Sequence, residues 1–163
     1  MPQHEQSKVP SSPEIHFPPP LFFAIAAVAG ILLNKSFPLG LASGWTRMIF
    51  APAGYLLMAG ALVMGVWAVV TFVHLRTGIF PHQPAKQLVN VGPYRFSRNP
   101  MYLSLNLGYV GFSLLLNSVW MLVFLPIALL ALHRFIIRRE ERYLAVRFGD
   151  DYRAYCGRVR RWI

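Results

Sequence analysis

The sequence is poor in acidic side chains and has a single cysteine. Only six of its 163 residues are Asp or Glu, and charged residues make up 13% of the chain, about half the ~25% typical of soluble domains. Cys156 alone excludes an intramolecular disulfide and a multi-cysteine metal site, and we expect no bound metal. A hydrophobic fraction of 55% excludes a disordered chain, which needs low hydrophobicity.

The sequence contains long apolar stretches that carry no charged residue. Met48–Val73, which lies between Arg47 and Arg76, exceeds the ~20 residues that one helix needs to cross the hydrocarbon core. A weaker apolar run extends from Leu21 to about residue 34, after three consecutive prolines. Each run predicts one membrane helix.

A second long gap in charge lies between Arg98 and Arg134. One straight helix over its 35 residues would be about 52 Å long, well beyond a ~30 Å hydrocarbon core. The gap therefore predicts two helices that meet near Asn117 and Ser118, an adjacent polar pair deep in the run.

These runs predict an all-α protein, a polytopic membrane helix bundle of about four transmembrane helices. The last two form a helical hairpin, and a C-terminal helical segment follows on the cytoplasmic side. We divide the chain into a polar, proline-rich tail (1–20), two N-terminal transmembrane helices (21–73) and a core that carries the sequence motifs (74–163).

The net charge of +10 predicts how the bundle lies in the membrane. With four spans, Lys35 and Arg47 face one side, and the other 14 of the 16 basic residues face the opposite side. Basic loops favour the cytoplasmic side, so we expect both termini to be cytoplasmic and the basic residues to meet anionic lipid headgroups. We expect no nucleic acid partner, because so much of the chain is apolar.

Small residues recur on one face of the third predicted helix. Ser104, Gly108 and Gly111 are spaced by four and three residues. In membranes such a face allows two helices to approach closely, so we expect a helix contact here.

A motif of turn and aromatic residues precedes the third helix. Gly92 and Pro93 predict a turn. Asn99 is placed to cap the following helix and Pro100 to begin it. Capping does not explain a polar and aromatic group that gathers at the membrane surface beside them, comprising Tyr94, Arg98 and Tyr102.

A second motif follows directly on the fourth predicted helix. Glu140 and Glu141 are two of the six acidic residues and stand between arginines. They form either a solvated helix face or a site for a cationic ligand. Gly149 predicts a helix end, and Arg153–Trp162 a basic amphipathic segment that anchors at the membrane interface.

Together these motifs resemble the isoprenylcysteine carboxyl methyltransferase family, which is related to the phospholipid methyltransferases. The resemblance rests on Gly-Pro-Tyr-x-x-x-Arg-Asn-Pro-x-Tyr at 92–102, a helical hairpin, Glu140-Glu141, and Phe148-Gly149-x-x-Tyr152-x-x-Tyr155. It implies an integral-membrane methyltransferase that uses S-adenosylmethionine. It also implies a lipophilic acceptor that enters from the bilayer, and a C-terminal segment that closes the cofactor pocket.

The resemblance also implies roles for individual residues. Leu88 and Val89 would offer backbone contacts to the adenine, and Glu140 and Glu141 would hold the ribose hydroxyls or the amino group. Arg98 would orient a carboxylate. The remaining cofactor-binding positions would be Gly92, Tyr94, Asn99, Pro100, Tyr102 and Tyr152, and the catalytic ones Arg98, Asn99 and Glu141.

Asn99 departs from the family pattern, which often has histidine there. Asn cannot act as a base near neutral pH, which suits a carboxylate acceptor of isoprenylcysteine type. A phospholipid amine, a phenol and a thiol stay open as acceptors, with His74 and His133 as candidate bases. Soluble methyltransferases bind the cofactor at a glycine-rich turn, and no G-x-G-x-x-G occurs in this sequence.

Two other functions fit part of the pattern. Sterol reductases are similar in the Arg-x-Pro-x-Tyr helix start and in the basic tail, but they bind polyanionic NADPH, which Glu140 and Glu141 disfavour by charge. A non-enzymatic membrane scaffold would account for the spans and the basic charge. It would leave both motifs without a purpose.

Overall fold

The computed structural model describes residues 17–77 and 85–163, and the part of the predicted N-terminal tail before residue 17 lies outside it. Every regular element in these residues is helical, which confirms the all-α class. In chain order the elements are α1 (Pro20–Ser36), η1 (Gly44–Thr46), α2 (Arg47–His74), η2 (Gly92–Arg95), α3 (Pro100–Leu115), α4 (Val119–Leu132), η3 (His133–Ile137) and α5 (Arg138–Arg158).

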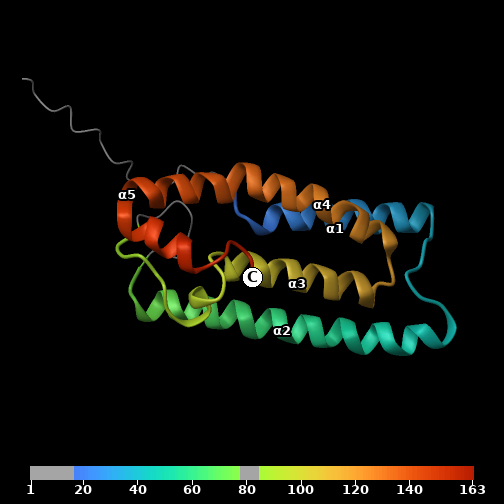
Figure 1. Ribbon diagram of the computed structural model, residues 1–163. Coiled ribbons are helices and arrows are strands. Elements are labelled where there is room, and N and C mark those ends of the chain that lie inside the picture. The colour runs from blue at the N-terminus through green and yellow to red at the C-terminus, as the bar shows by residue number, and fades with distance from the viewer. Residues whose placement is uncertain (1–16, 78–84) are drawn as a thin grey trace, which may run out of the picture.

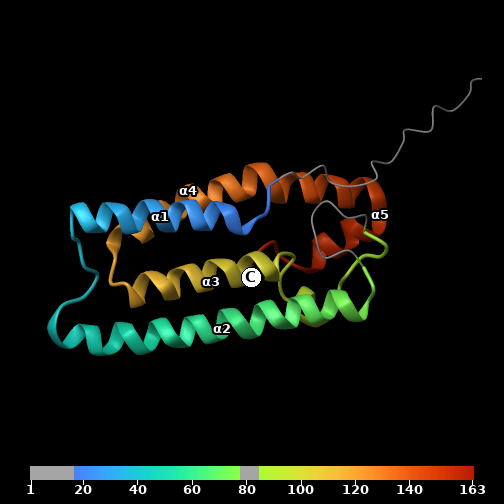
Figure 2. The same ribbon diagram turned by 180° about the vertical axis from the view of Figure 1, so that it is seen from behind.

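Four of the helices, α1 to α4, run side by side along the length of the molecule (Figures 1 and 2). Helix α1 packs on α4, and α2 packs on α3. Phe22 near the start of α1 stacks on Phe135, just beyond the end of α4, while Gly30 lies against Met121 near the start of α4. These contacts make α1 and α4 antiparallel.

The predicted small-residue face of α3 forms the contact with α2. A Cβ added at Gly111 would lie 2.8 Å from the carbonyl oxygen of Gly54, and one added at Gly65 would lie 3.1 Å from Ser104 Oγ. Gly108 opposes Ala61 between these two points. The antiparallel helices therefore touch at their backbones, as small residues allow in membranes.

The turn between α3 and α4 falls where the polar pair predicted it. Asn117 adopts a positive φ of 51°, which Asn tolerates better than most residues. Its side chain accepts a 2.8 Å hydrogen bond from the Ala42 N–H and donates a 2.9 Å one to the Ala42 carbonyl. The amide thus ties the α3–α4 turn to the loop between α1 and α2.

Two stretches, Gly44–His74 and Val119–Arg158, are long and apolar enough to cross a membrane. In the first stretch, only 6% of the most apolar 18 residues are buried inside the molecule. The core helix of a soluble protein is mostly buried. Helices α1 and α3 have 17 and 16 residues, or about 26 and 24 Å. The exposed apolar surface fits a membrane helix bundle, and the number of four crossings stays a prediction.

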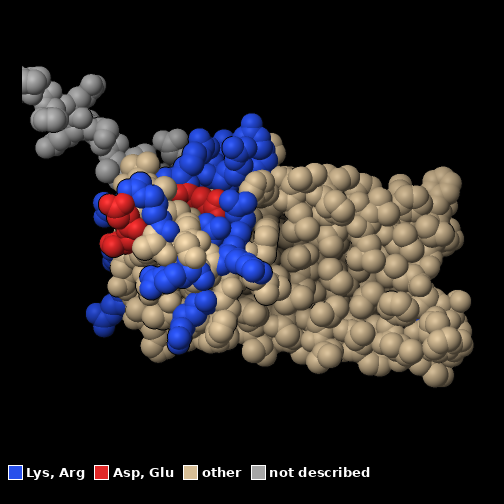
Figure 3. Space-filling model, viewed as in Figure 1, with Lys and Arg blue, Asp and Glu red and all other residues tan. Residues whose placement is uncertain are grey.

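Charged side chains gather at one end of the bundle. In the view of Figure 3 the basic and acidic residues cover the end that carries α5, and the rest of the visible surface has none. This end also holds η2 and the C-terminal residues (Figure 1). We call this end, formed by η2, α5 and the C-terminal residues, the head of the bundle. Lys35 and Arg47 lie at the opposite end.

Helices α4 and α5 are joined through η3 into one continuous helical rod, and the chain reverses direction within α5. Residues His133–Ile137 between α4 and α5 form a π-helix, an element that occurs frequently at functional sites. Gly149 has φ 51° and ψ −120° and breaks α5 into two limbs, at the position where the sequence predicted a helix end. The second limb returns toward the start of α3 (Figure 1).

The C-terminal segment does not have the exposed face expected of an interface anchor. Tyr155 and Val159 are buried in a cluster with Tyr152, and Trp162 packs against the main core of the bundle. The prediction was wrong because the break at Gly149 folds these aromatic residues onto the protein itself.

Candidate functional site

The segment before α3 is held against α2 by a tight turn. Gly92 has φ 59°, and an added Cβ would meet Thr71 Oγ1 at 2.7 Å. Only glycine combines this backbone with such a close approach. The turn places Pro93 and Tyr94 in buried positions, with Tyr94 against Phe72 and Val89. Gly92 thus has a structural role in positioning the first motif.

Glu141 of α5 lies between two arginines from distant parts of the chain. Arg161 binds it in a bidentate pair, with Nε to Oε1 at 2.8 Å and Nη2 to Oε2 at 2.7 Å. Arg98 Nη1 lies 3.3 Å from the same Oε1 that Arg161 Nε binds. Two guanidinium groups around one carboxylate leave this cluster with a net positive charge.

Glu140, the neighbouring residue, has different surroundings. Its Oε1 accepts a 2.7 Å hydrogen bond from the Tyr102 hydroxyl of α3. Unlike Glu141, Glu140 forms no ion pair within residues 17–77 and 85–163. Burial raises the pKa of Glu140 to about 7, the Tyr102 hydrogen bond opposes that rise, and the charge of Glu141 adds to it. Glu140 is therefore a carboxyl group poised to accept a cation or a proton.

The C-terminal residues fasten onto the start of α3. The Arg98 N–H donates to the Arg160 carbonyl at 3.0 Å, and Asn99 Nδ2 donates to the Arg161 carbonyl at 3.1 Å. Asn99 is the residue before α3, but its side chain makes no cap hydrogen bond. The predicted capping role was wrong because the amide is engaged by the C-terminal segment instead. Pro100 does begin α3, as predicted.

Buried tyrosines join the two motifs beneath this fastening. The Tyr155 hydroxyl donates a 2.7 Å hydrogen bond to the Tyr94 carbonyl. Burial raises the pKa of Tyr155 to about 12, although Arg98 nearby lowers it, so the hydroxyl stays a donor at neutral pH. Leu88 packs against the Tyr152 and Tyr155 cluster. The structure thus brings all the predicted site residues to the head of the bundle, in contact with α2, α3 or α5.

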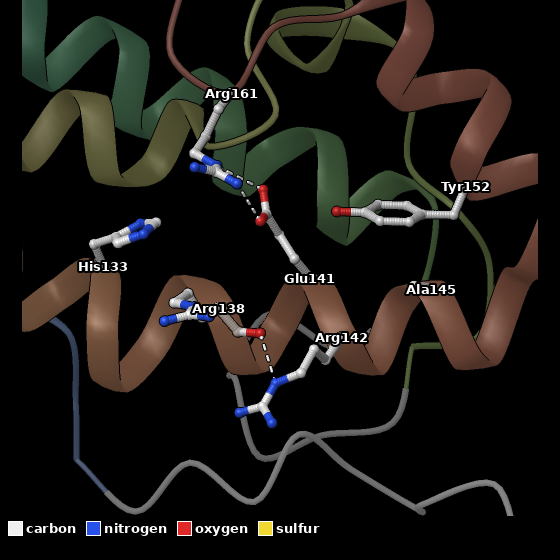
Figure 4. A pocket seen from close by; sticks show the side chains of 7 residues that line it. All are labelled: His133, Arg138, Glu141, Arg142, Ala145, Tyr152 and Arg161. Atoms are coloured by element: carbon white, nitrogen blue, oxygen red, sulfur yellow. Dashed lines mark hydrogen bonds and ion pairs between the residues drawn. The ribbon is translucent and has the colours of Figure 1, made fainter.

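A pocket of ≈ 330 Å³ opens beside Glu141. Figure 4 shows the His133 ring, the Arg161–Glu141 pair and the Tyr152 hydroxyl directed toward one another around it. Its seven lining residues are His133, Arg138, Glu141, Arg142, Ala145, Tyr152 and Arg161. Three arginines against one glutamate make the lining cationic.

Arg161 and Arg138, which line this pocket, were not among the predicted site residues. Both lie in runs of arginine that read as general basic charge, and no local signal distinguishes them. Tyr155 was part of the motif without an assigned role. Of the two candidate bases, His133 lines the pocket, whereas His74 is exposed at the end of α2, with its Nδ1 2.9 Å from the Val70 carbonyl.

Two features of the head suit a ligand with groups of both signs. Arg98 Nε is buried and has no hydrogen-bond partner among the described residues, and an unsatisfied buried donor is costly unless a ligand accepts from it. Glu140 offers a carboxylate that forms no ion pair with the residues that the structure describes. A zwitterionic amino-acid group would satisfy both, so the residues present fit the amino-acid part of S-adenosylmethionine.

Comparison with known proteins places the chain in a family. The family model for phospholipid methyltransferase matches residues 49–151, well over half of the chain. The chain belongs to the phospholipid methyltransferase family. It is also 43% identical over 63 residues to an uncharacterized protein of Haemophilus influenzae, a match that takes in 39% of this chain and all of that protein. No solved structure matches the chain.

Membership of the phospholipid methyltransferase family confirms the resemblance at the level of the family, to which isoprenylcysteine carboxyl methyltransferases are related. The match begins at the third residue of α2 and ends at residue 151. It includes the whole first motif and the Glu140-Glu141 pair, and it stops just before Tyr152 and Tyr155. With the two long apolar stretches, it indicates a membrane protein with methyltransferase activity.

Proposed function

We propose that the protein is an S-adenosylmethionine-dependent methyltransferase that acts on a lipophilic acceptor, a carboxylate of isoprenylcysteine type. The observation that carries the proposal is the convergence of the two motifs. Arg98 from the first and Glu141 from the second lie 3.3 Å apart, and Tyr102 bonds Glu140. A scaffold would not need this partly buried network of ionisable groups.

The cofactor would be held at the head of the bundle by residues of both motifs. Glu140 would take its amino group, and Arg98 would take an oxygen through its unsatisfied Nε. Leu88 and Val89 would border the adenine, beside Tyr94 and Tyr152, with Gly92, Asn99 and Pro100 supporting the wall. S-adenosylmethionine supplies an electrophilic methyl group on a sulfonium.

The chain's own residues would align the acceptor and exclude water. Charge is neutralised when an anionic acceptor takes a methyl group from a sulfonium, so a dry site favours the transfer. Alignment at near-attack distance supplies much of the rest. Asn99, whose amide is bound to the Arg161 carbonyl, would hold the C-terminal segment over the site and not act as a base.

The proposed orientation places both termini and the active site in the cytoplasm. The charged head in Figure 3 would then lie at the inner leaflet, where anionic lipid headgroups attract basic side chains. The acceptor would enter sideways from the bilayer. No nucleic acid is involved in this proposal.

The NADPH-dependent reductase remains the alternative with a specific observation behind it, the three arginines that line the pocket. Such a lining suits a polyanionic cofactor. The family match and Glu140, which forms no ion pair among the described residues, favour the sulfonium cofactor.

The test is a calorimetric titration of the full chain in an uncharged detergent. S-adenosylmethionine and its demethylated product are expected to bind at micromolar concentration, and Glu140→Gln and Glu141→Gln are expected to weaken that binding at least tenfold. NADPH is the comparison ligand. Binding of NADPH alone would assign the protein to the reductases, and binding of neither ligand by a folded sample would favour the scaffold.

A further inference from the structure

The pocket beside Glu141 lies where the apolar part of the long rod ends. His133 directly follows Leu132, the last residue of α4, which is fully buried. Arg138 begins α5 one turn beyond. A lipid that enters from the bilayer along α4 would bring its polar head to this level first.

The charges around the pocket favour an anion. Glu141 is the acidic residue among those that line the pocket. Arg161 already binds both carboxylate oxygens of Glu141, and Arg98 lies close to one of them. Among the described residues Arg138 forms no ion pair. An added ligand therefore meets uncompensated positive charge.

Donor groups remain available in the same place. Arg161 uses Nε and Nη2 on Glu141. A guanidinium has five N–H donors, and Nη1 forms no hydrogen bond with the described part of the chain, so it can donate to a ligand. His133 is the first residue of the π-helix, and its ring is directed toward the pocket (Figure 4). The Arg142 guanidinium points away from Glu141 in the same view, so we leave it out of the site.

We propose that His133, Arg138 and Arg161 form an oxyanion subsite that holds an anionic oxygen group carried by the lipophilic acceptor. A carboxylate and a phosphodiester share this chemistry, since arginine binds both through paired N–H donors. That the bound lipid is the methyl acceptor rests on the proposed function. The binding of an oxyanion lipid at these residues does not.

The test measures binding of the full chain in uncharged detergent to three amphiphiles. N-acetyl-S-farnesylcysteine carries a carboxylate, its methyl ester is the neutral match, and a lysophosphatidylethanolamine carries the phosphodiester. At least one oxyanion probe is expected to bind tenfold or more tightly than the ester, and which one does so identifies the source of the oxyanion. Arg138→Gln and His133→Gln are each expected to reduce that preference by about tenfold.

Arg147→Gln is the matched control, because it removes the same charge from the exposed surface of the same helix outside the pocket. If this control loses the preference equally, the effect is general surface charge and the subsite is wrong. Equal binding of the ester and both oxyanion probes, or an unchanged preference in Arg138→Gln, also overturns it.

S-adenosylmethionine separates the two proposals. Arg138→Gln is expected to leave its affinity unchanged, and an equal loss for cofactor and lipid would assign the oxyanion to the cofactor's own carboxylate, against the inference. If oxyanion lipids bind as expected but S-adenosylmethionine does not bind at all, the subsite stands and the methyltransferase proposal fails.

Discussion

The phenol of Tyr102 donates a 2.7 Å hydrogen bond to the carboxylate of Glu140, and so links the first turn of α3 to the first turn of α5. One residue further along α5, Glu141 is held by arginines instead. The two adjacent carboxylates thus have different partners, a phenol for Glu140 and guanidinium groups for Glu141. Burial raises the pKa of Glu140 to about 7, so its charge depends on protonation or on a bound cation.

Glu140 is expected to make the protein less stable as pH rises toward 7. Its pKa is about 7 in the folded protein and ordinarily 4.5, so between these values the folded state binds the extra proton. Stability from this group is fully present below about pH 4.5 and is lost as pH rises through 7, by on the order of 3 kcal/mol. Glu140→Gln removes this loss, and its advantage in melting temperature over the wild type should grow from pH 5 to pH 8.

Asp151→Asn serves as the control for this series, because it neutralises an exposed carboxylate on the same helix. Its melting temperature relative to the wild type should not rise with pH in the same way. An advantage of Glu140→Gln that is constant over the range would show that Glu140 does not titrate there.

Arg161→Gln is expected to loosen the C-terminal segment. The bidentate pair with Glu141 is lost, and with it the geometry that places the Arg160 carbonyl on the Arg98 N–H. Hydrogen exchange of peptides that contain Arg98 or residues 156–163 should accelerate. The cost in global stability should stay below about 1 kcal/mol, since the Arg161 side chain is 38% exposed.

The comparison variant for the C-terminal segment is Arg160→Gln. The Arg160 side chain is exposed and forms no ion pair among the described residues, so exchange should match the wild type. Equal acceleration in both variants would mean that general charge, and not the Glu141 pair, holds the segment.

The contact between α2 and α3 offers a test on two glycines with opposite expectations. Gly111→Ala would place a methyl group 2.8 Å from the Gly54 carbonyl oxygen, which forces the helices apart and should cost about 1–3 kcal/mol. Gly60→Ala, on α2 with nothing within 4 Å, should be neutral or stabilising by up to about 1 kcal/mol. Thermal melting in detergent measures both. Similar melting temperatures for the two variants would contradict the close helix contact.

Local sequence signals predicted the parts of the fold that depend on neighbouring residues. The polar pair Asn117-Ser118 predicted the α3–α4 turn, because buried apolar helices end where polar groups can be satisfied. The spacing of Ser104, Gly108 and Gly111 predicted that this face of α3 contacts another helix, though not that the partner is α2, and Gly149 predicted the break in α5. In each case the physical cause lies within a few residues.

The parts that depend on distant residues could not be predicted in the same way. Arg161 and Glu141 are 20 residues apart, and the pair forms only because the rod breaks at Gly149 and returns. The same return gives Asn99 a partner other than its own helix. The π-helix, which begins at the pocket residue His133, has no signature among its residues.

Membrane orientation is testable with single cysteines, because Cys156 is the one native cysteine. In a Cys156→Ser background, Ser43→Cys lies in the loop between α1 and α2, and Asn90→Cys lies near the charged head; both positions are exposed. With the charged head in the cytoplasm, a membrane-impermeant maleimide should label Ser43→Cys in intact spheroplasts. It should label Asn90→Cys only after lysis. The reverse pattern would place the head outside the cell. Labelling of both positions before lysis would mean that the four helices do not form a bundle that spans the membrane.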